Sequence, residues 1–357
     1  MSRKKNETEN NNNNLTIDPN LENNGNSTDS PQEASGKGAM IGHIVILSAI
    51  FIILGLSIWK LAVWNLGTDS EISSDTTDVI IEAENEDYIV YADKSLQEEY
   101  EDGITTVLML GDNILSDYQK SDGVANQLAS LTGATVYDCS FSNMRLASQS
   151  PVYDATIPND AFSFYYLANC IATGDYTTLY ESLPTLTGAN DSFTDTIKTL
   201  EGLDFDKIDV ITILYGPSDY LNGKLVSNPG DTKDIASYSG SIASGISLLQ
   251  EAYPHIRIVF VSPNYCMTTD ENGESVSSDL YSNDYGRLVD YMIAAKNVAV
   301  EYNFTFLDNY WGLGINSANY EDYLEDNYLY PNGAGRTLIA QRIAEIVGVS
   351  DTQSDTE

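Results

Sequence analysis

Histidine is almost absent from this chain of 357 residues, which contains only His43 and His255. Histidine is the side chain most often used as a general base near neutral pH, and it is a frequent ligand of catalytic metals. Any mechanism that needs an imidazole must therefore use one of these two residues. A metal site built from several histidines is excluded.

Basic residues are also scarce, with 17 lysines and arginines against 53 acidic residues and a formal net charge of −36. Proteins that bind duplex nucleic acid neutralise phosphates with clustered lysine and arginine side chains. This composition therefore excludes nucleic acid as a partner. A surface this acidic favours solubility and repels anionic surfaces.

Cysteine occurs only three times, as Cys139, Cys170 and Cys266, and no C-x-x-C pair is present. Three cysteines are too few for a disulfide framework. Each lies in or beside an apolar run, so we expect three buried free thiols. The chain shows no cofactor motif, and the acidic segment 270–274 lacks the full register of a calcium loop, so no metal or cofactor site is predicted.

The N-terminal part divides by composition. Residues 1–39 are rich in Asn, Glu and Ser and are predicted to be a disordered tail. Residues 40–59 then run for 20 positions without a formal charge, long enough to cross a bilayer core. The flanking segments are too polar to bury a core helix, which is the alternative. No small-residue cleavage site follows, so we predict an uncleaved signal anchor over 40–64.

Basic residues around this segment predict its orientation. Arg3, Lys4, Lys5 and Lys37 precede it, whereas after Lys60 the next basic residue is Lys94. Lysine and arginine are retained on the cytoplasmic side. We therefore expect a single-pass protein of the cell membrane with a cytoplasmic tail and a large extracytoplasmic C-terminal domain.

The rest of the chain is predicted to form a linker over 65–103 with an edge strand near 88–91, a domain over 104–348, and a disordered acidic tail over 349–357. Short apolar runs alternate with stretches of helical spacing, which predicts an α/β domain with a central parallel sheet covered by helices on both faces, a three-layer α/β/α sandwich. The predicted strands are 105–110, 134–138, 209–215, 256–262 and 305–308, and the clearest predicted helices are 123–131, 235–252, 285–301 and 335–347.

Three short motifs follow predicted strands, where sites lie in parallel α/β folds. They are Gly111-Asp112-Asn113, Gly216-Pro217-Ser218-Asp219 and Asn327-Tyr328-Leu329-Tyr330-Pro331-Asn332. Over roughly residues 105–347, their order and spacing resemble the SGNH, or GDSL, esterases and lipases. The resemblance implies a flavodoxin-like SGNH-hydrolase fold and a cleft at the carboxyl ends of the strands.

The resemblance also implies which positions would carry catalysis, and each of them is changed. Asn113 stands where the family has its nucleophilic serine, and Ser218 stands where it has an oxyanion-binding asparagine. Asn327 and Tyr330 replace the aspartate and histidine of the triad. The family's second block supplies a glycine N–H to the oxyanion, and the corresponding segment, Cys139 to Asn143, has no glycine.

Little of the family's chemistry survives these changes. A carboxamide is neither nucleophile nor base, and a phenol with a pKa near ~10 is a poor base at neutral pH. His255 precedes a predicted strand, at the opposite edge of the sheet, and we expect it to be a surface or loop residue. No base is visible in the sequence for Ser116, Ser140, Ser142 or Ser218. A carboxylate pair, Asp112 and Asp219, remains as a less favoured route to hydrolysis.

The candidate cleft residues are Asp112, Asn113, Ser140, Asn143, Ser218, Asp219, Tyr220, Tyr330 and Asn332. Tyrosines gather before the last motif and could bind sugar, although amphipathic aromatics commonly line such surfaces. We expect a catalytically degenerate pseudo-esterase that binds a cell-surface glycan, an acyl ligand or an envelope protein. Two alternatives stay open: an active, divergent esterase or acyltransferase acting on envelope carbohydrate, and a scaffold subunit of a membrane O-acyltransferase or a cell-wall assembly.

Overall fold

The computed structural model describes residues 85–348 apart from 92–93 and 188–190. The chain divides into two compact units, Met1–Thr76 and Thr77–Glu357, and the described residues all belong to the second. The predicted N-terminal tail, membrane helix and C-terminal tail, and most of the linker, lie outside these residues. None of the helices in the described part combines the length and apolar character needed to cross a membrane.

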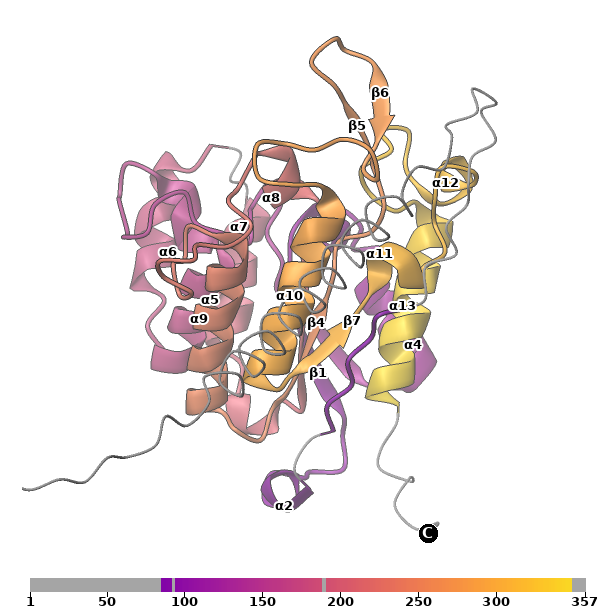
Figure 1. The fold of residues 1–357 in the computed structure, drawn as a ribbon. Helices are drawn as coiled ribbons and strands as arrows, with labels where there is room; N and C mark the ends of the chain where they lie inside the picture. Colours follow the sequence, from indigo (N-terminus) through magenta and orange to yellow (C-terminus); the bar gives the residue numbers. More distant parts are fainter. Residues whose placement is uncertain (1–84, 92–93, 188–190, 349–357) are drawn as a thin grey trace, which may run out of the picture. The chain divides into compact units, whose positions relative to one another are not determined.

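A five-stranded parallel sheet lies at the centre of the described unit (Figure 1). Its strands are ordered β2-β1-β3-β4-β7, and each pairs with its neighbours in parallel register. The predicted α/β class and central parallel sheet are confirmed. The strands are β1 (Thr106–Gly111), β2 (Thr135–Asp138), β3 (Val210–Leu214), β4 (Arg257–Val261) and β7 (Thr305–Leu307).

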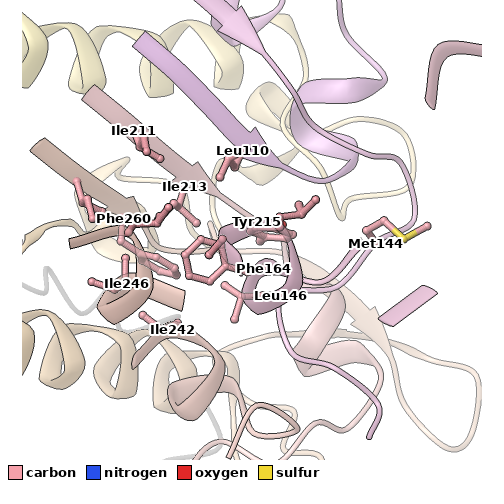
Figure 2. Packing of buried hydrophobic residues seen from close by; sticks show 14 of the residues in the cluster. Leu110, Met144, Leu146, Phe164, Ile211, Ile213, Tyr215, Ile242, Ile246 and Phe260 are labelled. Carbon is pink, nitrogen blue, oxygen red and sulfur yellow. The ribbon is translucent and has the colours of Figure 1, made fainter. Parts of the chain in front are cut away.

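Alternate side chains of the sheet enter two separate cores. On one face, Leu108 and Ile211 belong to a cluster that also contains residues of helices α5 (Phe164–Thr173), α9 (Tyr238–Ala252) and α10 (Leu288–Tyr302). Figure 2 shows part of this packing, including Phe164 and Ile246 beside the strands. Each such buried side chain stabilises the fold by ~1.5–3 kcal/mol.

The opposite face is covered by helices α4 (Val124–Thr132) and α13 (Gly333–Val347). Val107 and Met109 of β1 point to this side, where Leu128 of α4 and Ile339 of α13 are fully buried with them. Because side chains alternate along a strand, a sheet that is apolar on both faces needs such a helical layer on each side. The predicted layers on both faces are therefore present.

The long connection between β2 and β3 contains helices that the sequence pattern did not predict. The segment FYYLANCIAT forms α5, and its buried residues Phe164, Leu167, Ala168 and Ile171 lie at helical spacing, a signal that the prediction missed. The remaining elements of this connection are η1 (Pro158–Phe162), α6 (Thr177–Ser182), η2 (Leu183–Thr185), α7 (Asp191–Glu201) and η3 (Phe205–Lys207).

Short elements complete the described unit. A two-stranded antiparallel hairpin, β5 (Met267–Thr269) with β6 (Ser275–Ser277), follows β4 and projects away from the sheet (Figure 1). The hairpin was not predicted either. The short helices are α2 (Lys94–Gln97), α3 (Asn113–Ser116), α8 (Ser218–Leu221), α11 (Asn309–Gly312) and α12 (Tyr320–Tyr323).

The segment predicted as an edge strand near residue 88 forms one antiparallel bridge to β7 rather than a full strand. The Tyr88 N–H donates to the Phe306 carbonyl at 2.9 Å, and the Phe306 N–H donates back at 2.8 Å. Asp87 anchors the segment further, because its carboxylate accepts two hydrogen bonds from the Arg342 guanidinium at 2.8 and 2.9 Å.

His255 is a loop residue before β4, as predicted, but it is buried and not on the surface, with only 5% of its area exposed. Its ring stacks on Tyr100 with 3.8 Å between the ring centroids, and its Nε2 atom lies 3.2 Å from the Phe205 carbonyl oxygen. Tyr100, which stacks on it, is distant in sequence and gave no local signal. The predicted state of the three cysteines is confirmed, since all are free and buried.

Candidate functional site

A polar pocket of about 300 Å³ opens where β1 and β3 end. Carboxyl ends of adjacent parallel strands meet at one edge of a sheet, which brings the first and second motifs of the chain together there. The last motif reaches the same pocket through Tyr330. The lining residues are Asn113, Asn143, Arg145, Asn159, Ser218, Leu221, Asn222 and Tyr330.

Asn113 begins helix α3 directly after β1 and is only 8% exposed. Both polar atoms of its side chain have partners within the protein. The Oδ1 atom accepts a hydrogen bond from the backbone N–H of Asn143 at 2.8 Å, and the Nδ2 group donates to the Asp117 carboxylate at 2.8 Å. Both polar atoms of Asn113 therefore have a protein partner, and the residue is a fixed part of the wall.

Asn143 adopts a backbone φ of 60°, in the left-handed region that glycine occupies without strain and asparagine tolerates. It thus has a glycine-like conformation in the segment after β2, where the resemblance implies a glycine whose N–H would stabilise an oxyanion. That N–H is taken up by the Asn113 carboxamide.

Asp112 lies beneath the pocket and is completely buried. Its Oδ2 atom accepts hydrogen bonds from the Gly216 N–H at 3.0 Å and from the Ser218 hydroxyl at 3.3 Å, while Oδ1 accepts from the Ile114 N–H at 3.2 Å. Burial, with a smaller effect from the nearby Asp219, raises the pKa of this carboxyl to about 7 against the opposing effect of these hydrogen bonds. Asp112 therefore joins the ends of β1 and β3.

Ser218 connects Asp112 to Tyr330. Its Oγ atom lies 3.3 Å from the Tyr330 hydroxyl, and either group can donate that hydrogen bond. Burial raises the pKa of Tyr330 to about 12, and the Asp112 carboxyl acts in the same direction. The Tyr330 ring packs against Gly216, where an added Cβ would lie 2.8 Å from a ring carbon. The sequence suggested no partner for Ser218, but the structure supplies these two.

The predicted carboxylate pair does not offer two free acids to a substrate. Asp219 is 1% exposed, and its two oxygens accept hydrogen bonds from the N–H groups of Leu146 and Ala147, both at 2.9 Å. Burial raises the pKa of Asp219, and the hydrogen bonds and the Arg145 guanidinium oppose that increase. The carboxylate thus holds the loop that carries Arg145 instead of facing the pocket.

Four other residues that the sequence singled out make contacts outside the pocket. The Ser140 hydroxyl donates to Asp138, and Tyr220 is buried with its hydroxyl donating to the Tyr281 carbonyl at 2.9 Å. Asn332 caps helix α13 by accepting from Ala334 N–H and Gly335 N–H. Asn327 is exposed and accepts from the Leu329 N–H at 3.0 Å. The lining of the pocket includes none of these four residues.

Four lining residues were not predicted: Arg145, Asn159, Leu221 and Asn222. Arg145 follows β2 by several residues, and Leu221 and Asn222 close the short helix α8, so the loops after β2 and β3 were the available signal. Of the tyrosines near the last motif, Tyr330 alone lines the pocket. Tyr310 is buried in the core, and Tyr320, Tyr323 and Tyr328 pack against the other core cluster.

The pocket's side chains are amides, hydroxyls, one guanidinium and one leucine. Within the described residues, no group of three or more His, Cys, Asp or Glu side chains is arranged to hold a metal ion. The arrangement can donate and accept hydrogen bonds and can bind a negative charge.

No family model matches the sequence, and no curated protein matches it. Solved structures do. A protein from Lactobacillus plantarum is 18% identical, with 69% of this chain and 98% of that chain covered and a TM-score of 0.48. A lipase/acylhydrolase from Enterococcus faecalis is 16% identical over 69% and 96% of the two chains, with a TM-score of 0.38. A carbohydrate acetylesterase from Sinorhizobium meliloti is 12% identical over 68% and 98%, with a TM-score of 0.40. In fold, the chain resembles the SGNH/GDSL hydrolases.

Proposed function

We propose that this domain is a pseudo-esterase: an SGNH-hydrolase-like module that binds a ligand in the pocket and does not hydrolyse esters. The observation that carries the proposal is the hydrogen bond from the Asn143 N–H to Asn113 Oδ1. The residue at the nucleophile position occupies the backbone donor that an oxyanion would need. Losing a single oxyanion donor in an esterase costs roughly 10²–10³ in turnover.

The lack of a base supports the same proposal. Tyr330 stands at the position of the family's histidine, and its pKa is raised to about 12 by burial. At neutral pH its phenol stays protonated and cannot accept a proton from a hydroxyl nucleophile. Asn327 is exposed and bonded to its own turn, so it does not orient a base.

One observation favours a second candidate, an active and divergent esterase or acyltransferase. The Ser218 hydroxyl donates to Asp112, whose pKa of about 7 is in the range useful for a general base. Against this, Asp112 Oδ2 also accepts from Gly216 N–H and is completely buried. The nearby Asn143 N–H is taken up by Asn113 and cannot stabilise an oxyanion.

A fluorophosphonate probe separates the two candidates, because it reacts covalently with activated serines. Full-length protein in detergent is incubated with the probe at pH 8, beside the variants Ser218→Ala and Ser142→Ala. The pseudo-esterase proposal expects no labelling of any of the three proteins. Labelling that disappears in Ser218→Ala and persists in Ser142→Ala would establish the divergent enzyme instead.

We further propose that the domain is extracytoplasmic and is held at the cell membrane by the apolar segment 40–59, with a cell-surface glycan or an envelope protein as its partner. The support is the 20-residue uncharged run and the basic residues that precede it. The full chain should sediment with membranes in carbonate, and a chain lacking residues 1–64 should not. Co-purification of a membrane O-acyltransferase or a cell-wall protein would favour the scaffold alternative.

A further inference from the structure

The pocket contains one charged side chain among its lining residues, and that side chain is cationic. This contrasts with the chain as a whole, which has 53 acidic and 17 basic residues. Arg145 comes from the loop between β2 and η1 and is half-buried. A half-buried guanidinium is stabilised by a negatively charged hydrogen-bond partner.

Within the described residues, no carboxylate forms a salt bridge with Arg145. Its Nη2 group donates to the neutral Gln149 Oε1 at 3.3 Å. Other cations of the domain do have such partners: Arg336 pairs with Asp122 and Glu325, and Arg342 with Asp87. The guanidinium at the pocket therefore retains donors for a ligand.

The surroundings of Arg145 keep its position fixed, and they include the buried Asp219 carboxylate as well as the Lys224 ammonium. The two residues that follow it, Leu146 and Ala147, are held by Asp219. The Lys224 ammonium is buried nearby and donates to the Ser148 carbonyl. Burial lowers the pKa of Lys224, and the Arg145 guanidinium lowers it further, which places the two cations within electrostatic reach of one another.

The remaining lining is suited to hydroxyl groups. The side chains of Asn143, Asn159 and Asn222 and the hydroxyls of Ser218 and Tyr330 offer both donors and acceptors. Leu221 is the only aliphatic side chain in the lining, so a fatty acyl chain would find almost no apolar surface. A volume of about 300 Å³ is at the small end of ligand sites and suits one sugar ring.

We propose that the pocket binds a carboxylated sugar, such as a uronic acid residue, with its carboxylate on the Arg145 guanidinium and its hydroxyls on the asparagine side chains. This inference rests on the proposed ligand-binding function. The planar guanidinium matches a carboxylate through two parallel hydrogen bonds. One cation balances one negative charge, and the acidic domain repels a dianion such as a phosphate monoester more strongly.

The test is calorimetric titration of the full-length protein in detergent with three probes: glucuronic acid, glucose and glucose 6-phosphate. Glucuronic acid should bind about tenfold or more tightly than glucose, the effect of one charge-assisted hydrogen-bonded contact. Arg145→Gln should remove that preference, and Arg145→Lys should restore part of it. Lys120→Gln, the same charge change at an exposed residue outside the pocket, should leave the preference intact.

Each other outcome overturns the inference. Equal binding of glucose and glucuronic acid would show that the pocket binds sugar but does not distinguish a charged sugar from a neutral one. The proposed ligand-binding function would then still hold. If glucose 6-phosphate bound most tightly, the preferred ligand would carry a phosphate and not a carboxylate. Binding of none of the probes would exclude the sugar, and the fluorophosphonate experiment would then decide independently whether the domain is a pseudo-esterase.

Discussion

The backbone N–H of Asn143 donates a hydrogen bond to Oδ1 of Asn113 at 2.8 Å, and this contact closes the site that the SGNH resemblance implies. The first residue stands in the loop after β2 and the second directly after β1. Since Asn113 also binds Asp117 through Nδ2, one side chain fixes two segments of the pocket wall. A serine at position 113 would be too short to make both contacts.

Replacing Asn113 by alanine should lower the free energy of unfolding by about 1–2 kcal/mol, because the part-buried N–H of Asn143 loses its partner. Urea denaturation followed by circular dichroism measures the change. Asn159→Ala is the matched control, because the Asn159 side chain makes a weak contact, to the Met144 sulfur at 3.9 Å. Equal effects of the two substitutions would argue against a structural role for the Asn113 contact.

The positive φ of Asn143 leads to a separate prediction. Asn143→Ala should destabilise the domain by about 1–2 kcal/mol because alanine is strained in the left-handed region. Asn143→Gly should not, since glycine adopts it freely. Both variants keep the N–H that binds Asn113, so their difference in urea midpoint isolates the backbone conformation. Similar midpoints would contradict the assignment of a strained turn.

Asp112 should make stability depend on pH. The unfolded chain releases this proton near pH ~3.9, whereas in the folded domain the pKa is raised to about 7 by burial. Between these values the unfolded state binds fewer protons, so the free energy of unfolding falls as pH rises and levels off above pH about 7. The contribution is on the order of a few kcal/mol.

Asp112→Asn isolates this contribution from other buried acids, such as Asp138 and Asp308, whose pKa values burial also raises. The difference in unfolding free energy between the wild type and this variant should decrease steadily from pH 4.5 to pH 7.5 in urea titrations. A difference that stays constant across this range would mean that Asp112 is ionised throughout.

Asp219 is predicted to be structural. Asp219→Ala removes the acceptor for two buried N–H groups and should cost about 3 kcal/mol of stability. The same substitution at Asp195, whose carboxylate forms an exposed ion pair with Lys198, should change stability by less than about 0.5 kcal/mol. Thermal or urea unfolding distinguishes the two cases, and a small effect at both positions would refute the anchoring role.

The three thiols should be inert in the native protein. Cys139, Cys170 and Cys266 are buried, and burial raises the pKa of each to about 12. Thiolate is the reactive form, so Ellman's reagent at pH 8 should titrate none of them until guanidinium unfolds the chain, when it should titrate all three. Rapid reaction of any thiol in the native state would reveal an exposed or activated cysteine.

Much of the sheet could be predicted because its signals are local. Each strand is a short apolar run between polar segments, and the helices α4, α9, α10 and α13 have amphipathic spacing. The helix α5 was not predicted, although its buried residues Phe164, Leu167, Ala168 and Ile171 lie at helical spacing as well. His255 was misjudged because the Tyr100 ring that stacks on it comes from a segment distant in sequence.

In the candidate site too, residues with a local sequence signal were predicted and residues placed by distant contacts were not. Asn113, Ser218 and Tyr330 were brought together correctly because motifs after adjacent parallel strands converge. Asn332 matched a motif but serves as a helix cap, a role that motif matching does not separate from ligand contact. Arg145 was missed because the position of its loop depends on Asp219, a contact across more than 70 residues of sequence.

Ester turnover tests the central claim most directly. Full-length protein in detergent is assayed with p-nitrophenyl acetate and with acetylated xylan at pH 7–9, beside Ser218→Ala and Asp112→Asn. We predict that the wild type releases product no faster than either variant or the buffer, because the pocket offers no activated nucleophile and the Asn143 N–H is taken up by Asn113. Turnover well above that background, lost in Ser218→Ala or in Asp112→Asn, would contradict the account and establish an active hydrolase.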